Sequence, residues 1–243
     1  MTALQLNFAI PKGVIVKMIN IAIDGPAGAG KSTLSKLLAK RFNFIYVDTG
    51  ALYRVIGLFV HRQGIDTRDI GGVSQLLPKI KLELLCAVEG QRVILNGEDV
   101  SAAIRMPEIS MAASNVSAIP EVRAFLLQLQ QNIARDNDCL MDGRDIGTVV
   151  LPNAQIKIFL TASPQDRAQR RYDELIERGV KVDYNVVLSE IIDRDAQDSG
   201  REIAPLKPAD DAVIVDTSGL ELEQSLERLY GIAAEKLQAL QYK

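Results

Sequence analysis

The sequence has little material for several common kinds of enzyme site, because its 243 residues include one histidine, two cysteines and no tryptophan. A zinc site or a serine-histidine-aspartate triad would have only His61 to draw on. Cys86 and Cys139 lie far apart and belong to no C-x-x-C pair. We therefore expect two buried thiols in a reducing, cytoplasmic environment, and chemistry that does not depend on imidazole.

Long apolar runs and an excess of basic residues are also missing. No segment approaches the roughly 20 apolar residues of a membrane helix, and residues 1–17 lack the basic start of a signal peptide. Because Met18 would make a sensible start, we expect residues 1–17 to be a dispensable extension. The formal charge of -3 argues against a broad nucleic-acid surface. We expect a cytoplasmic monomer with no membrane or nucleic-acid partner.

A glycine-rich stretch, GPAGAGKST, connects a short apolar run at 19–23 to the helical stretch LSKLLAKRF. It satisfies the pattern G-x-x-x-x-G-K-[ST], in which backbone N–H groups surround phosphate oxygens. A turn that merely connected strand to helix would need neither the lysine nor the hydroxyl. We expect a nucleotide phosphate loop, with Lys31 on the β and γ phosphates and Ser32 on Mg²⁺. The loop residues are Gly25, Pro26, Ala27, Gly28, Ala29, Gly30, Lys31, Ser32 and Thr33.

Short apolar runs alternate with amphipathic helical stretches along most of the chain. The runs lie at 19–23, 44–47, 139–141, 155–160 and 212–215. Continuously apolar strands are typical of a parallel sheet covered by helices on both faces, where ligands bind beyond the carboxyl ends of the strands. We therefore predict an α/β fold of the P-loop NTPase class, with a five-stranded parallel sheet flanked by helices.

Two segments interrupt this alternation. The first, 64–134, contains a predicted β-hairpin at 82–95, with Asn96-Gly97 as a further tight turn, and then helical stretches. We interpret it as an inserted substrate-binding subdomain; the alternative is a hairpin with a structural role only. The second, 164–201, is predicted to be a short helical lid and a following helix. The core is then formed by 18–63, 135–163 and 202–243.

The first lid helix carries Arg167, Arg171 and Arg178 on one face. Beside a phosphate loop, this stripe favours a lid that brings positive charge over the nucleotide phosphates. The alternative is a solvated face whose arginines pair with acidic neighbours on the same helix. Those neighbours are Asp173, Glu174 and Glu177.

Two aspartates lie at predicted strand ends. Asp24 directly precedes the phosphate loop, and we expect it to cap that loop. Asp142 follows the run at 139–141, where it would either hold magnesium through water or orient Arg144. We favour the second role for Asp142.

Seven segments stand out in order: IDGPAGAGKST at 23–33, DTGALYR at 48–54, GEDVS-x-x-IR at 97–105, AASNVSAIPEVR at 112–123, DGRDIGTVVLP at 142–152, KIFLTAS at 157–163 and RD-x-x-D-x-x-R-x-x-APL at 194–206. Together they resemble the bacterial cytidylate kinases, which have the nucleoside monophosphate kinase fold. The phosphate loop alone is shared by many unrelated NTPases, whereas the whole set is specific. The resemblance covers almost everything from residue 18 to the last predicted strand.

This resemblance implies ATP-dependent phosphorylation of CMP and dCMP, with Mg²⁺, and makes 64–134 an NMP-binding subdomain. It implies a catalytic set of Lys31, Arg144, Arg171 and Arg194. The residues implied around the acceptor nucleotide are Thr49, Arg54, Ser114, Arg123, Arg144, Asp145, Arg194, Asp198 and Arg201. The family often has serine in place of Thr49, which keeps the hydroxyl. Many members have glycine in place of Ser32, and here we expect the hydroxyl on magnesium.

The residue types agree with such chemistry. An acceptor phosphate is already anionic, so transfer needs no strong base, and lysine, magnesium and arginines overcome the repulsion between anions. The resemblance offers Arg123, Ser114 and Asp145 for cytosine, since uracil would leave buried partners unpaired at about 1–3 kcal/mol each. One alternative is a kinase of the same fold that acts on UMP, AMP, dTMP or shikimate. Another is a nucleotide-dependent switch.

Overall fold

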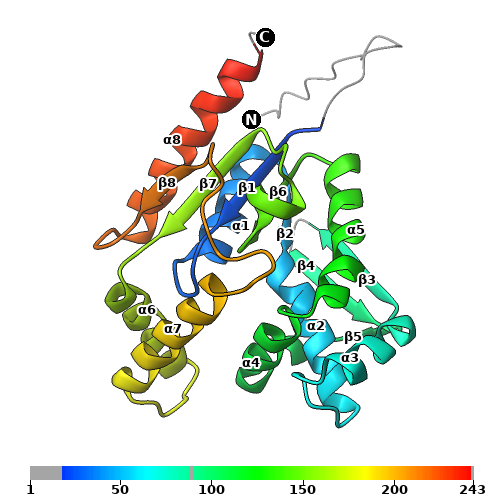
Figure 1. Ribbon diagram of the computed structural model, residues 1–243. Helices are drawn as coiled ribbons and strands as arrows, with labels where there is room; N and C mark the ends of the chain where they lie inside the picture. Colours follow the sequence, from blue (N-terminus) through cyan, green and yellow to red (C-terminus); the bar gives the residue numbers. More distant parts are fainter. Residues whose placement is uncertain (1–17, 88–89, 242–243) are drawn as a thin grey trace, which may run out of the picture.

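A five-stranded parallel sheet forms the centre of the computed structural model, which describes residues 18–87 and 90–241 (Figure 1). The strand order is β2-β6-β1-β7-β8. The strands are β1 Asn20–Asp24, β2 Ile45–Asp48, β6 Cys139–Gly143, β7 Ile156–Thr161 and β8 Val213–Asp216. The predicted α/β fold with five parallel strands is confirmed. The expectations for residues 1–17 and for the Cys86 thiol lie outside the described residues and side chains.

Both faces of the sheet are covered, which explains the continuously apolar strands. Helices α1 (Lys31–Phe42) and α8 (Leu222–Gln241) lie against one face, where Ile21 and Ile23 pack. Ala22 points to the opposite face and packs with residues of α5 (Pro120–Asp136) and of the segment after β6. Within the described part of the chain, no helix is long and apolar enough to cross a membrane.

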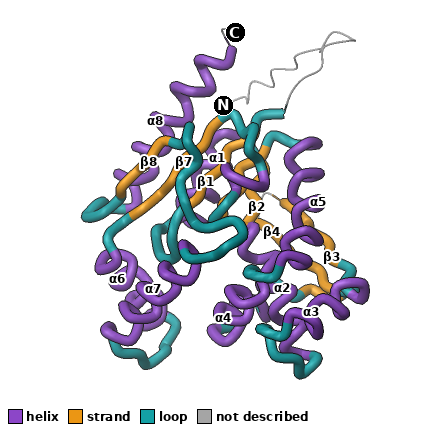
Figure 2. The backbone as a smooth tube through the Cα atoms, viewed as in Figure 1, coloured by secondary structure: helices purple, strands orange, loops and turns teal. Residues whose placement is uncertain are grey.

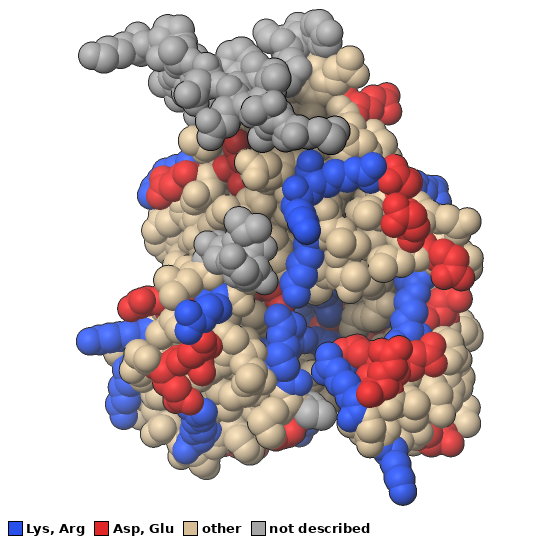
Figure 3. Space-filling model, turned by 180° about the vertical axis from the view of Figure 1, so that it is seen from behind, with Lys and Arg blue, Asp and Glu red and all other residues tan. Residues whose placement is uncertain are grey.

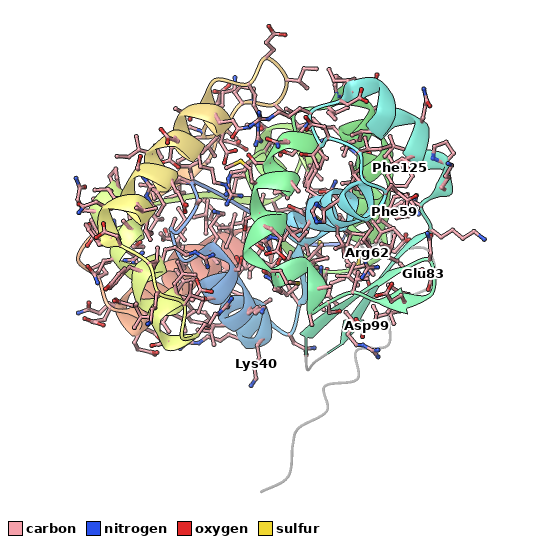
Figure 4. The ribbon with its side chains drawn as sticks, turned by 90° about the horizontal axis from the view of Figure 1, so that it is seen from below. Lys40, Phe59, Arg62, Glu83, Asp99 and Phe125 are labelled. Carbon is pink, nitrogen blue, oxygen red and sulfur yellow. The ribbon has the colours of Figure 1, made fainter. Side chains whose placement is uncertain are left out.

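The first inserted segment, 64–134, packs together with α2 (Thr49–Arg62) around an apolar core separate from that of the sheet. Its elements are α3 Ile70–Leu76, 3₁₀ turns at Leu77–Lys79 and Ala103–Arg105, β3 Leu82–Ala87, β4 Gly90–Leu95, β5 Glu98–Asp99 and α4 Pro107–Val116, followed by α5. Strands β3 and β4 form the predicted hairpin, and β5, which follows Asn96-Gly97, extends it to a three-stranded antiparallel sheet. Phe59 of α2 and Phe125 of α5 both pack against this core and lie on the same side of the molecule in Figure 4.

The second inserted segment, 164–201, contains two helices, α6 (Pro164–Glu177) and α7 (Tyr184–Ser199). Figure 2 shows these helices below the sheet at the left and the subdomain below it at the right. They pack through Ala168, Leu175, Val187 and Ile191. Ser163 caps α6 by accepting from the Asp166 N–H, and Gly179 follows the helix with a φ of 76°. The two inserted segments, 64–134 and 164–201, therefore flank the carboxyl ends of the sheet strands.

Candidate active site

The phosphate loop lies between β1 and α1, as its sequence predicts. Gly28 and Gly30 have φ values of 74° and 83°, a region that glycine enters without strain. Gly30 is the N-cap of α1, so the loop leads directly into the positive end of that helix. Lys31 folds back across the loop, where its Nζ donates to Pro26 O at 2.6 Å. Burial, and then the charge of Arg144, lowers the pKa of Lys31.

Asp142, at the end of β6, contacts the loop through its side chain. Its Oδ2 accepts from Ser32 Oγ at 3.0 Å, and its Oδ1 accepts from the Tyr46 hydroxyl at 2.7 Å. Burial, and then the charge of Asp48, raises the pKa of Asp142 to about 6. The expectation that Asp142 orients Arg144 is wrong, because Arg144 Nε donates instead to Asp198 Oδ2 at 2.8 Å.

Asp24 also has a different role from the one expected. Its two carboxylate oxygens accept from the backbone N–H groups of Ile146 and Gly147, both at 2.7 Å. It therefore holds the π-helical segment Ile146–Val150 after β6 rather than capping the phosphate loop. Burial raises the pKa of Asp24 to about 6, in spite of these two hydrogen bonds.

A second cluster lies where the subdomain meets the core. Arg123 of α5 forms a buried ion pair with Asp145 and donates from Nη1 to Ser117 O at 3.0 Å. The Ser114 side chain is 4% exposed, and its hydroxyl has no hydrogen-bond partner among the described residues. The ring of Tyr53 lies 5.7 Å from the Arg123 guanidinium. The cluster thus offers an unused hydroxyl, a guanidinium and a carboxylate.

A third cluster is built around Asp198 of α7, which is 1% exposed. It pairs with Arg144 and with Arg201. Burial alone would raise the pKa of Asp198, but Arg144, Arg201 and Arg194 outweigh burial and hold the pKa below its usual value. Burial, and then the charge of Arg144, lowers the pKa of Arg194 to about 10, and the Arg194 Nε has no partner among the described residues. This concentration of guanidinium groups is suited to an anion.

The three arginines predicted to form one face of the lid helix do not share one environment. Arg167 is buried: it pairs with Asp195 at 2.6 Å and donates to Ala27 O at 3.1 Å. Its guanidinium therefore fixes α6 to the phosphate loop, and the prediction that it faces the phosphates is wrong. Arg171 and Arg178 both pair with Glu174, at 2.8 and 2.6 Å, as the alternative interpretation of the stripe expected.

One cavity of about 1050 Å³ connects these clusters. In Figure 3, Lys and Arg side chains gather along the hollow between the two lower lobes. Gly25 and Pro26 are not among the residues that line the cavity, whereas the other predicted loop and acceptor residues line it. The predicted residues that line it are Ala27, Gly28, Ala29, Gly30, Lys31, Ser32, Thr33, Thr49, Arg54, Ser114, Arg123, Arg144, Asp145, Arg171, Arg194, Asp198 and Arg201.

Sequence reasoning missed several residues of this region. Arg105 lines the cavity and pairs with Asp48 at 2.9 Å; the conspicuous G-E-D-V-S-x-x-I-R stretch was the available signal. Gln91 of β4 accepts from Asp48 N at 2.8 Å and donates to Asp48 O at 3.3 Å. Thr49 was predicted, but its anchor was not: Thr49 Oγ1 donates to Asp142 O at 2.7 Å. No sequence signal pointed to Tyr46 or Gln91, because their contacts join segments distant in sequence.

Comparison with known proteins decides the family. The sequence model of cytidylate kinase matches residues 21–235. The chain belongs to the cytidylate kinase family. It is 50% identical over 214 residues to a cytidylate kinase of Caldicellulosiruptor saccharolyticus, which covers 88% of this chain and 95% of that protein. It is 46% identical over 218 residues to a cytidylate kinase of Carboxydothermus hydrogenoformans, which covers 90% and 98%.

The resemblance inferred from the seven segments is therefore confirmed, and with it the assignment to the phosphotransferases. Among solved structures, an uncharacterized protein from Eubacterium ventriosum is similar in fold, with a TM-score of 0.51 and 12% identity. That alignment covers 88% of this chain and 97% of the other. At so low an identity the likeness shows only that the two folds are similar, and it gives no information on the substrate.

Proposed function

We propose that the chain transfers the γ-phosphoryl group of ATP to CMP and dCMP, giving ADP and CDP or dCDP. The observation that carries this proposal is the continuous cavity, which has the phosphate loop at one end and the Ser114, Arg123 and Asp145 cluster at the other. The names of the relatives at 46–50% identity agree with it. We propose further that 64–134 holds the acceptor, that 164–201 acts as a lid, and that the protein is a monomer in the cytoplasm.

The phosphate loop and α1 would hold the triphosphate of ATP. Backbone N–H groups from 27–33 would surround the β phosphate, with the positive end of α1 directed at the same point. Lys31 would exchange its contact with Pro26 O for β and γ oxygens. Arg171 lines the cavity from α6 and would approach the transferred group after release from Glu174.

The residues at the loop also fit a magnesium ion. Magnesium prefers hydroxyl, carboxylate and water oxygens, and the Ser32 hydroxyl and the Asp142 carboxylate are in contact here. The raised pKa of Asp142 reflects a buried negative charge that a cation would stabilise. Ser32 and, through water, Asp142 would hold the ion, which when bound neutralises charge on the transferred phosphoryl group.

The acceptor phosphate would lie among the guanidinium groups of Arg54, Arg144, Arg194 and Arg201, which line the cavity between the two ends. Asp198 keeps Arg144 and Arg201 in place. These groups would hold two anions in line, and since the acceptor oxygen is already ionised, the reaction needs no strong general base. Thr49 would lie beside them, with its hydroxyl anchored to Asp142 O.

Cytosine would be recognised at the Arg123 and Asp145 pair. Cytosine has acceptors at O2 and N3 and a donor amino group at C4, which complement a guanidinium, a hydroxyl and a carboxylate. Ser114 supports this assignment, because its buried hydroxyl has no partner among the described residues and is free to bond a base. Uracil would place N3–H against a donor and O4 against the Asp145 carboxylate.

An assay of ADP release tests the proposal. The chain is supplied with ATP and Mg²⁺ and, in parallel, with CMP, dCMP, UMP, AMP, dTMP and shikimate. Rapid turnover with CMP and dCMP alone is expected. Turnover confined to another acceptor would overturn the assignment of the base site, and slow ATP hydrolysis that no acceptor accelerates would favour a nucleotide switch.

A further inference from the structure

Tyr46 makes a contact that the proposed reaction does not explain. It lies in β2, at the edge of the sheet, and its hydroxyl donates to Asp142 Oδ1 at 2.7 Å. Ser32 donates to the other oxygen of the same carboxylate at 3.0 Å. The Asp142 carboxylate is therefore held between two hydroxyl groups, one from the edge strand and one from the phosphate loop.

The Tyr46 hydroxyl acts as a hydrogen-bond donor to the Asp142 carboxylate. A tyrosine hydroxyl carries its proton at neutral pH, and here it donates that proton to Asp142 Oδ1. Asp142 is 4% exposed, which leaves its carboxylate little access to water. A buried carboxylate that lost this donor would have an unsatisfied oxygen and would be free to rotate.

Tyr46 does not act on the nucleotide directly. It contacts Asp142 and is outside the set of described residues that line the cavity. The Lys36 Nζ lies 5.8 Å from the centre of its ring, and the ring packs with the apolar cluster under α1. Any influence of the hydroxyl on the reaction therefore passes through its two polar neighbours, Asp142 and Ser32.

We infer that Tyr46 is a positioning residue for the metal side of the ATP site: it occupies Asp142 Oδ1 so that Oδ2 stays directed at Ser32 and at a divalent cation held there. This inference rests on the proposed function and extends it, because it assigns a role to a residue outside the cavity. Groups that orient a metal-binding carboxylate typically change metal affinity about 10- to 100-fold when removed.

The substitution Tyr46→Phe removes the hydroxyl and keeps the ring. Tyr230→Phe is the matched control, since Tyr230 lies on α8, stacks on Phe42 and lies 4.0 Å from the Arg41 guanidinium. Mn²⁺ binding is measured by electron paramagnetic resonance with a non-hydrolysable ATP analogue and no acceptor. We expect the Mn²⁺ dissociation constant to rise about tenfold in Tyr46→Phe and to stay unchanged in Tyr230→Phe. Equal Mn²⁺ affinity in Tyr46→Phe and wild type would overturn the inference.

A second readout uses the wild-type chain, in case Tyr46→Phe folds poorly. Because the chain contains no tryptophan, its intrinsic fluorescence comes from its six tyrosines. Adding Mg²⁺ to the wild-type complex with the ATP analogue should change this emission, because a cation at Asp142 alters the carboxylate that accepts from the Tyr46 hydroxyl. No change of emission in wild type would contradict the inference. Neither readout uses CMP, so failure of CMP turnover with the metal result intact would overturn the proposed function alone.

Discussion

Arg123 and Asp145 form an ion pair in which the two side chains are only 9% and 5% exposed. The pair connects α5, which closes the inserted subdomain, to the loop that follows β6 of the core. Removing one charge of a buried ion pair destabilises the fold, because the remaining charge is left in a medium that solvates it poorly. The pair therefore fixes the geometry of the candidate base site.

Asp145→Asn should lower both the rate with CMP and the preference for CMP over UMP. The amide can donate to uracil O4, while the cytosine amino group loses its acceptor, so we expect the ratio of the two kcat/KM values to fall about 10- to 100-fold, which corresponds to 1–3 kcal/mol. Arg123 also loses its counter-charge, so stability should fall by about 3 kcal/mol. Steady-state kinetics and denaturant unfolding measure the two effects.

The matched control is Asp99→Asn, because Asp99 also pairs with an arginine, Arg92, but lies at the outer side of the subdomain and is 37% exposed. Its kinetics and stability should stay close to wild type. An undiminished CMP preference in Asp145→Asn, with folding intact, would remove Asp145 from the base site.

Glu174→Gln should strengthen the binding of ATP. Glu174 pairs with both Arg171 and Arg178, so a triphosphate must compete with it for these guanidinium groups. All three side chains are at least partly exposed, and such pairs contribute about 1 kcal/mol or less. The apparent KM for ATP should therefore fall about two- to fivefold, and the difference from wild type should shrink at high salt.

Glu177→Gln provides the comparison for this effect. Glu177 is exposed, lies on the same helix and carries the same charge, but forms no ion pair with described residues. Equal KM values for ATP in the two variants would show that the change of net charge, and not the release of Arg171 and Arg178, is responsible.

Much of the fold could be predicted because its signals are local. Continuous apolar runs that alternate with amphipathic stretches predicted the five strands, and Asn96-Gly97 predicted a tight turn of the small antiparallel sheet. Helix α3 was missed because its sequence, IGGVSQL, contains two glycines and is only seven residues long. The π-helical segment Ile146–Val150 was missed because its conformation depends on Asp24, more than 100 residues earlier.

The candidate site shows the same division. The phosphate loop and most of the residues implied by the family motifs do line one cavity. The partners of the charged residues could not be predicted, because several carboxylates and arginines compete and only the packed chain decides among them. Arg144 thus pairs with Asp198 rather than Asp142, and Arg167 fixes a helix rather than facing phosphate.

Asp24 should make folding stability depend on pH. Burial raises its pKa to about 6, above the ordinary value of 3.8. Between these values the folded chain keeps a proton that the unfolded chain has released, so this group's contribution to stability is full below about pH 4 and is lost as the pH rises through about 6. The unfolding free energy of wild type relative to Asp24→Asn should fall by up to about 3 kcal/mol between pH 4 and 7.

Urea unfolding from pH 5 to 7 follows most of this change and avoids general acid unfolding. Asp216→Asn is the control, because Ser218 holds the pKa of Asp216 below its usual range. Wild type relative to that variant should show no loss of stability as the pH rises. A wild-type difference from Asp24→Asn that stays constant with pH would mean that Asp24 remains ionised throughout.

Gly25→Ala should damage the fold far more than Gly64→Ala, although both glycines have positive φ values, 149° and 69°, which alanine disfavours. A Cβ on Gly25 would lie 1.9 Å from Leu160 O in β7, so the phosphate loop and that strand would have to separate. At Gly64 a Cβ meets nothing within 4 Å. We expect a loss above about 4 kcal/mol for Gly25→Ala and about 1–2 kcal/mol for Gly64→Ala. Denaturant unfolding of both variants measures this, and equal losses would mean that the loop can move from β7 without harm.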